Sequence, residues 1–152
     1  MKLRMNYREA SPAAFQAMLQ LEGFVTRSGL ERSVRELIRL RVSQLNGCSF
    51  CVDLHSREML AHEPPERVYL LPVWREAPCY TDRERAALAF AEAVAFISER
   101  GVPEEVFEEM RKHYDEAGIV HCIMAVNAIN AWNRLAIATG MYPGAMEPAS
   151  KE

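Results

Sequence analysis

Two cysteines and a histidine are the residues of this chain whose types and spacing best suit chemistry. Cys48 and Cys51 form a Cys-x-x-Cys pair, and His55 follows four residues later. In a helix that begins at Cys48, each residue turns by about 100°, so the three side chains share one stripe with His55 between the sulfurs. A neighbouring imidazole and a helix N-terminus both lower the pKa of a thiol. The spacing indicates a redox-active dithiol.

A Cys-x-x-Cys pair can also be a buried structural pair or half of a zinc site. A structural zinc ion needs four ligands, and the sequence has no second Cys-x-x-Cys and no His-x-x-x-His pair. The pattern therefore favours redox chemistry, and we predict no metal and no cofactor. Cys79 and Cys122 have no cysteine near them in the sequence, so we expect them to be ordinary core or loop thiols.

Two predicted helices position this motif. Apolar residues repeat with helical period over residues 31–46, and Asn46-Gly47 is a typical helix stop. A second helix is predicted from Cys48 to about His62, where Pro64-Pro65 ends it. A short turn between the two helices would thus present the cysteines.

The remaining start and stop signals predict an all-α protein of about six to seven helices. Ser11-Pro12 starts one helix, and a capping box at residues 81–84 starts another that ends at Gly101. A proline at the first helical position starts a helix at Pro103, and the last long helix covers residues 118–139. We expect residues 1–10 to be an irregular arm, 65–71 to hold a short helix, 72–80 to be a loop and 143–152 to be a frayed tail.

Length and charge limit the class of protein. The chain has 152 residues and a formal net charge of −3, which predict one domain over residues 1–152, with a core of about 11–142, and no nucleic-acid partner. We predict no leader peptide, no membrane span and a cytoplasmic location.

The last predicted helix is apolar on nearly all sides, so we expect the domain or a partner subunit to cover it. Its amides Asn127, Asn130 and Asn133 share one side, where a structural or interface role is favoured. His121 is expected to be a packed core histidine. Trp74 and Arg75 lie in the predicted loop and suit either the mouth of the active site or a loop anchor.

The spacing of Glu36, Cys48, Cys51 and His55 fits the signature Glu-x(11)-Cys-x-x-Cys-x-x-x-His. With the segments 36–47, 71–75 and 127–135, it resembles alkylhydroperoxidase D-like proteins of the carboxymuconolactone decarboxylase superfamily, over about residues 30–140. The resemblance implies an all-helical homo-oligomer, a trimer or hexamer. It also implies a thiol-dependent peroxidase that acts on organic hydroperoxides. The reductant would be an unknown thiol protein or a small dithiol.

The resemblance also implies a role for each motif residue. Cys51 attacks the peroxide, Cys48 resolves the intermediate into a disulfide, His55 is the general base, and Glu36 feeds a proton relay to His55 through water. The electrostatics of a helix terminus argue for Cys48 as the first attacker instead. On its own predicted helix, Glu36 points away from the apolar stripe, so its role rests on the resemblance alone.

One position departs from the prototype peroxidases of the family. They carry histidine between the cysteines, as Cys-x-His-Cys, and this chain has Phe50. The site is then more apolar, and both an efficient peroxidase rate and the family's usual reductant come into question. Two alternatives stay open: a decarboxylase of the carboxymuconolactone type, and a non-enzymatic, oligomeric redox sensor.

Overall fold

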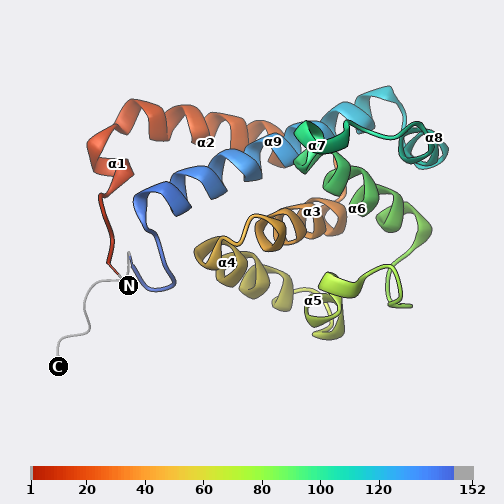
Figure 1. The fold of residues 1–152 in the computed structure, drawn as a ribbon, viewed down its shortest axis with the longest axis horizontal. Coiled ribbons are helices and arrows are strands. Elements are labelled where there is room, and N and C mark those ends of the chain that lie inside the picture. The colour runs from red at the N-terminus through yellow and green to blue at the C-terminus, as the bar shows by residue number, and fades with distance from the viewer. Residues whose placement is uncertain (1, 146–152) are drawn as a thin grey trace.

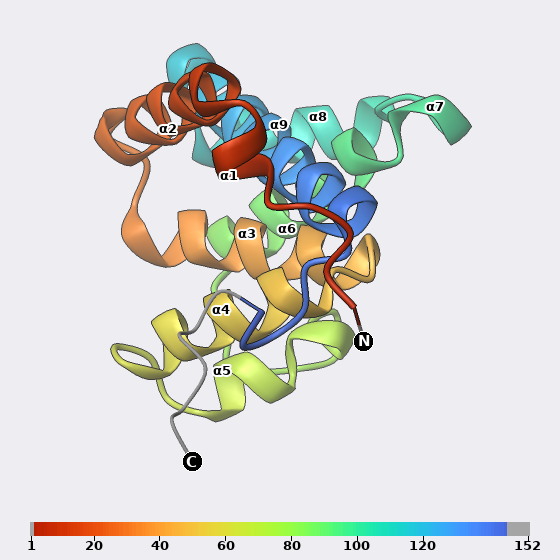
Figure 2. The same cartoon turned by 90° about the vertical axis from the view of Figure 1, so that its left-hand side faces the viewer.

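The helix α3 (Arg32–Leu45) lies at the centre of the fold in this computed structural model, which describes residues 2–145. Around it pack α9 (Glu116–Thr139), α6 (Asp82–Ala95) and α4 (Ser49–Leu60), as Figures 1 and 2 show. The sequence explains this position, because the apolar residues of α3 face several neighbours at once and almost all are buried: Val34, Leu37, Ile38, Leu40 and Val42.

The N-terminal segment covers one side of α9. The helix α2 (Pro12–Arg27) runs alongside α9, and Pro12 occupies its first position, as predicted (Figure 1). The prediction of an irregular arm over residues 1–10 is wrong in part, because Tyr7–Ala10 form the short helix α1. The side chain of Asn6 accepts a hydrogen bond from the backbone N–H of Arg8 (3.1 Å) and caps this turn, a local signal that starts a helix.

The middle of the chain holds short elements before α6. These are α5 (Glu66–Tyr69) and a 3-10 turn, η1 (Leu71–Val73). The predicted capping box is confirmed, since Thr81 and Glu84 exchange side chain–backbone hydrogen bonds at the start of α6. The predicted end at Gly101 is wrong. Helical geometry stops at Phe96 (φ −104°, ψ 32°), and Ile97–Arg100 form a separate turn, α7.

The last two long helices begin close to the predicted residues. Pro103 is the N-cap of α8 (Glu104–His113) rather than its first residue. The helix α9 begins at Glu116 instead of Gly118, because Asp115 accepts a hydrogen bond from the N–H of Gly118 (2.7 Å) as N-cap.

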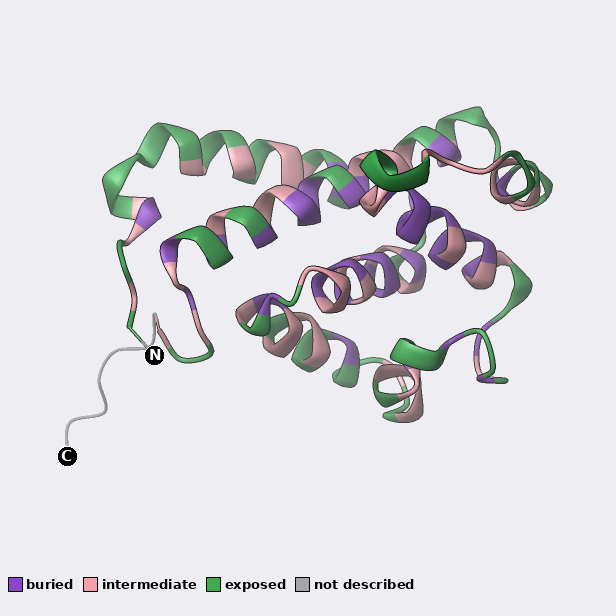
Figure 3. Ribbon diagram, viewed as in Figure 1, coloured by how far each residue is buried: buried purple, intermediate pink, exposed green. Residues whose placement is uncertain are grey.

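The surface of α9 is not covered on every side in the single chain. Val120 and Ile137 are 52% and 47% exposed, so the expectation of burial all round does not hold within one subunit (Figure 3). The predicted frayed tail over 143–152 lies mostly outside the described residues, which end at 145.

The all-α prediction is confirmed. Residues 2–145 form nine α-helices, of which six have ten or more residues and three are single turns of four, and no strand occurs among them. Within the same range, no helix has both the length and the apolar character needed to span a membrane.

Candidate active site

A sharp turn between α3 and α4 places the two cysteines. Gly47 adopts the left-handed conformation (φ +68°) directly after α3. The N–H of Cys48 then donates to the carbonyl of Ser43 (3.0 Å), and the N–H of Gly47 donates to that of Gln44 (3.1 Å). This Schellman-type ending satisfies the last carbonyls of α3 and makes Cys48 the N-cap of α4.

Side-chain amides tie this turn to α9. The amide nitrogen of Asn46 donates to the side-chain oxygens of Asn130 (2.7 Å) and Asn133 (2.8 Å). Asn133 is fully buried and donates in turn to the hydroxyl of Ser43 (3.1 Å). Two of the three predicted polar positions on α9 are therefore structural, whereas Asn127 is exposed. Hydrogen bonds with residues of α3 and α9 therefore hold the turn that carries the cysteines.

The structure joins Cys48 and Cys51 in a disulfide, with their Cα atoms 5.3 Å apart. The backbone N–H of Cys51 donates to Sγ of Cys48 (3.3 Å). Both residues are buried, and they pack among apolar side chains contributed by the N-terminal arm, α4 and α9. The predicted geometry of a dithiol at a helix N-terminus is thus present.

Cys51 and His55 line one cavity of about 250 Å³. Three aromatic rings from distant parts of the chain, Tyr7, Phe15 and Trp132, enclose one side of it and contact one another with centroids 6.0–6.5 Å apart. Cys48 does not line this cavity. The structure therefore brings Cys51, rather than Cys48, together with His55 at an apolar opening.

Glu58 is the hydrogen-bond partner of His55. Nδ1 of His55 lies 2.8 Å from Oε2 of Glu58. This hydrogen bond holds the pKa of the Glu58 carboxyl below its ordinary value. An ionised carboxylate only accepts hydrogen bonds, so Nδ1 of His55 is the donor in this contact, and Nε2 is the ring nitrogen that lies outside it. The spacing of three residues on one helix is the sequence signal that could have identified Glu58.

Two further polar residues complete the cavity wall. Arg39 forms an ion pair with Glu22, whose other oxygen accepts a hydrogen bond from the indole N–H of Trp132 (3.1 Å). Burial lowers the pKa of Arg39, and the nearby Glu58 partly opposes this shift. Sequence reasoning missed Arg39 and Glu22, because the contacts that unite them cross 17 and 110 residues of chain.

Glu36 lies near this group without contacting His55. Its carboxylate is buried and accepts a hydrogen bond from Nε of Arg32 (2.6 Å). Glu36 shares a second cavity, of about 470 Å³, with Arg39 and Glu58. The solvent-facing position suggested by the helical period is therefore not observed. The proton-relay role of Glu36 stays a prediction, with Glu58 placed between Glu36 and His55.

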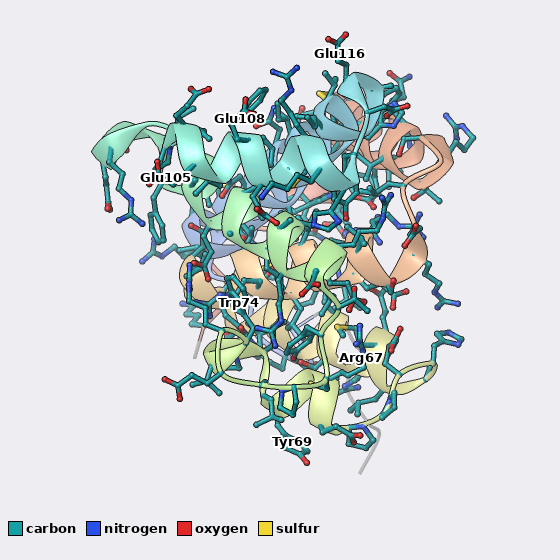
Figure 4. All side chains as sticks on the ribbon, turned by 90° about the vertical axis from the view of Figure 1, so that its right-hand side faces the viewer. Arg67, Tyr69, Trp74, Glu105, Glu108 and Glu116 are labelled. Carbon is teal, nitrogen blue, oxygen red and sulfur yellow. A yellow bond between two sulfur atoms is a disulfide. The ribbon has the colours of Figure 1, made fainter. Side chains whose placement is uncertain are left out.

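Trp74 and Arg75 act as a loop anchor. Both donate to the carboxylate of Glu92, at 2.9 Å and 2.7 Å, and Arg41 donates to it from α3 at 2.7 Å. Figure 4 shows Trp74 among the side chains of the segment before α6. Neither residue lines the cavity of Cys51, so of the two roles left open by the sequence, the structure supports the anchor.

The remaining candidates lie apart from the dithiol. Burial raises the pKa of Cys122 to about 12, and Cys79 is a half-buried loop residue. His121 is half-buried and packs edge-on against Phe24, with ring centroids 5.9 Å apart. In the described part of the chain, His, Cys, Asp and Glu side chains nowhere gather in threes as metal ligands.

Known proteins resemble this chain over most of its length. The model of the carboxymuconolactone decarboxylase family matches residues 12–93, more than half of the chain. The uncharacterised protein YdfG of Bacillus subtilis is 39% identical over 92% of this chain and 96% of its own length.

Two solved structures share the fold with high coverage. ATU0492 of Agrobacterium tumefaciens, a protein of unknown function described as a candidate antioxidant defence protein AhpD, has 43% identity and a TM-score of 0.90, covering 98% of this chain and 100% of its own. A peroxidase-related protein of Ralstonia eutropha JMP134 with an alkylhydroperoxidase AhpD core has 27% identity and a TM-score of 0.78, covering 88% and 72%.

These relatives support a peroxidase-like role. They also agree with the helical architecture described above. This chain belongs to the carboxymuconolactone decarboxylase family, among its AhpD-like members.

Proposed function

We propose that the protein is a thiol-dependent peroxidase that reduces organic hydroperoxides with Cys48 and Cys51. The observation that carries this proposal is the shared cavity: Cys51 opens onto the same apolar space as His55, while Cys48 lies within disulfide distance one helical turn away. The reaction uses only these side chains, the peroxide and a thiol reductant.

In the reduced protein, the thiolate of Cys51 attacks the terminal oxygen of the hydroperoxide. The O–O bond breaks, the alcohol leaves, and Cys51 becomes a sulfenic acid. The thiolate of Cys48 then attacks the Cys51 sulfur, water leaves and the disulfide forms. The peroxide has taken two electrons from the dithiol. A thiol reductant then restores the dithiol by thiol–disulfide exchange.

His55 handles the protons in this scheme. With Nδ1–H held by the ionised Glu58, Nε2 takes the proton of Cys51 and returns it to the departing alkoxide. The thiolate of Cys48 is stabilised by the backbone N–H of Cys51 and by the positive end of the α4 dipole. In this assignment, Cys51 attacks first because it shares its cavity with His55, although the helix terminus favours the thiolate of Cys48.

The shape of the cavity suggests the kind of hydroperoxide. Its aromatic wall, together with Phe50 and a volume of about 250 Å³, suits a small molecule with an apolar body better than hydrogen peroxide. Phe50 stands where the prototype peroxidases carry histidine, so proton transfer here depends on His55, with Glu58 as its hydrogen-bond partner and Glu36 as the predicted member of a relay. A homo-oligomer, a trimer or hexamer, and a cytoplasmic location remain part of the proposal.

The test is to mix reduced protein with an alkyl hydroperoxide and to follow intact mass over seconds. We expect rapid loss of two hydrogens, mapped to a disulfide between Cys48 and Cys51. Cys51→Ser should abolish the reaction, His55→Ala should slow it about a hundredfold, and Cys122→Ser is the matched control with an unchanged rate.

Two outcomes would replace the proposal. Full peroxide consumption by Cys51→Ser would show that this cysteine is not the attacking residue. Thiols that stay reduced for many minutes would exclude peroxide as substrate. A slow oxidation that occurs once and changes oligomer size would then favour the redox sensor. Decarboxylation of a carboxymuconolactone by a variant that lacks both cysteines would favour the decarboxylase.

A further inference from the structure

The two cysteines of the disulfide line different cavities. Cys51 lines the aromatic cavity with His55. Cys48 lines a separate cavity of about 310 Å³ between the N-terminal arm, the α3–α4 turn and the end of α9. Among residues 2–145, the two cavities share no lining residue. Each cysteine of the disulfide thus borders its own cavity.

We call the cavity that Cys48 lines the Cys48 cavity, and its charged residues are basic. Lys2 and Arg4 line it, and its lining among the described residues includes no aspartate or glutamate. The rest of its wall comes from small or apolar residues: Gly47, Ser49, Ile137, Gly140 and Met141. A cavity with two cations and no acid favours an anionic visitor.

The fold fixes the backbone of the arm that carries the two cations. The N–H of Arg4 donates to the carbonyl of Thr139 (2.9 Å), and its guanidinium donates to the carbonyl of Ala138 (3.3 Å). Gly140 ends α9 in the left-handed conformation (φ +77°), and a Cβ there would lie 3.0 Å from the carbonyl oxygen of Lys2. The close approach of the arm to α9 therefore needs this glycine.

We propose that the Cys48 cavity is the entrance for the reductant, and that this reductant is a small thiol carrying a carboxylate. This inference rests on the proposed function for its biological purpose, because it describes how the oxidised dithiol is restored. It assigns peroxide and reductant to opposite sides of one disulfide.

The exchange balances in two steps. The thiolate of the reductant attacks Sγ of Cys48, the Cys48–Cys51 bond breaks, and Cys51 leaves as a thiolate, which takes up a proton from solvent by way of Nε2 of His55. A second thiol then attacks the sulfur of the reductant in the mixed disulfide. Cys48 leaves as a thiolate, which the N–H of Cys51 and the N-terminus of α4 stabilise. Each leaving thiolate has its own stabilising group.

The first experiment locates the attacked sulfur. The disulfide is prepared with diamide, which avoids peroxide, and is mixed with 3-mercaptopropionate, quenched with N-ethylmaleimide and mapped by peptide mass spectrometry. We expect mercaptopropionate on Cys48 and maleimide on Cys51. Mercaptopropionate found mainly on Cys51 would overturn the proposal.

The second experiment tests the cations. Reduction rates are compared for 3-mercaptopropionate, neutral 2-mercaptoethanol and cationic cysteamine. In Lys2→Gln/Arg4→Gln, the anionic thiol should react about tenfold more slowly relative to the wild type, and the neutral thiol should react unchanged. Arg111→Gln, at an exposed cation on α8, is the matched control. If the double variant keeps the wild-type ratio of the reduction rates for the anionic and the neutral thiol, the entrance does not select by charge and the proposal is refuted.

The two proposals fail separately. Oxidation of the reduced double variant by hydroperoxide should match the wild type, because its substitutions lie outside the cavity of Cys51. If peroxide never oxidises the thiols while Cys48 still carries the adduct, the peroxidase proposal fails and the entrance stands. If peroxide reacts normally while Cys51 carries the adduct, the entrance fails alone.

Discussion

Two regions of the molecule hold the same pair of residue types, a thiol and a paired carboxylate. In the interior around α6 and α9, these are Cys122 and Glu92. At the cavity beside α4, they are Cys51 and Glu58. Glu92 has three donors from two segments, Arg41 in α3 and Trp74 and Arg75 before α6. Cys122 lies elsewhere in the interior, on α9, and is fully buried.

At the cavity, the same groups are less completely enclosed. Glu58 has His55 as its hydrogen-bond partner, and His55 and Cys51 face a space that a small molecule can enter. The two regions thus contain the same residue types in different surroundings. A carboxylate surrounded by donors stabilises the fold, whereas a carboxylate that holds one nitrogen of an imidazole leaves the other nitrogen available for chemistry.

The largest expected difference is in the reactivity of the thiols. Burial raises the pKa of Cys122 from 9.0 to about 12, which lowers its thiolate fraction at about pH 8 roughly a thousandfold. In reduced native protein, iodoacetamide should label Cys51 and leave Cys122 unlabelled, as followed by peptide mass spectrometry over time. Equal labelling rates would remove the contrast between the two regions.

A large difference is also expected in stability. Glu92→Ala leaves Arg41, Trp74 and Arg75 without their acceptor and should lower the free energy of unfolding by about 3 kcal/mol. Chemical denaturation measures this change, and Glu108→Ala at an exposed site is the control. The rate of oxidation by hydroperoxide should stay within about twofold of the wild type. A much slower rate would mean that the anchor supports the chemistry directly.

Glu58→Gln should show the opposite pattern. An amide no longer fixes the proton on Nδ1 of His55, so oxidation of the dithiol should slow about tenfold, while the free energy of unfolding changes by less than about 0.5 kcal/mol. Stopped-flow oxidation and denaturation curves give both values. Glu36→Gln in parallel separates the two carboxylates. A loss of rate in Glu36→Gln alone would return the relay to Glu36.

The smallest effect concerns the pH dependence of stability. Because its hydrogen bond with His55 lowers the pKa of Glu58 below 4.5, Glu58 contributes stability above that pH. The contribution is lost as the pH falls through the lowered value. The melting temperature of the wild type should slightly exceed that of Glu58→Gln at neutral pH, and the two should converge as the pH falls below the lowered pKa of Glu58. A constant difference would argue against an ionised Glu58.

The sequence predicted the parts of the site that depend on local geometry. The placement of Cys51 and His55 on one helix, the stop at Gly47 and the capping box at Thr81 all follow from helix periodicity and helix ends. Cys48, which was predicted on the same stripe, is the extended N-cap of α4 and lines another cavity. Glu58 was within reach of the same reasoning, at three residues from His55 on one helix. The roles of these residues in catalysis stay predictions until they are measured.

The rest depended on packing between distant segments. Tyr7, Phe15 and Trp132 meet at the cavity only because α1 and α2 lie along α9. The break at Phe96 has no glycine or proline to signal it, and the next four residues, Ile97-Ser-Glu-Arg100, are all compatible with a helix. Local propensity is a weak guide where tertiary contacts decide, both at such breaks and at the cavity wall.

The amide cluster of Asn46, Asn130 and Asn133 carries no charge at any pH. The support of the α3–α4 turn therefore does not titrate, whereas His55 and Glu58 beside it do. Acid or base within the native range changes the protonation of the site and leaves the frame under Cys48 intact. A pH profile of the dithiol accordingly reflects its titratable neighbours and not this amide cluster.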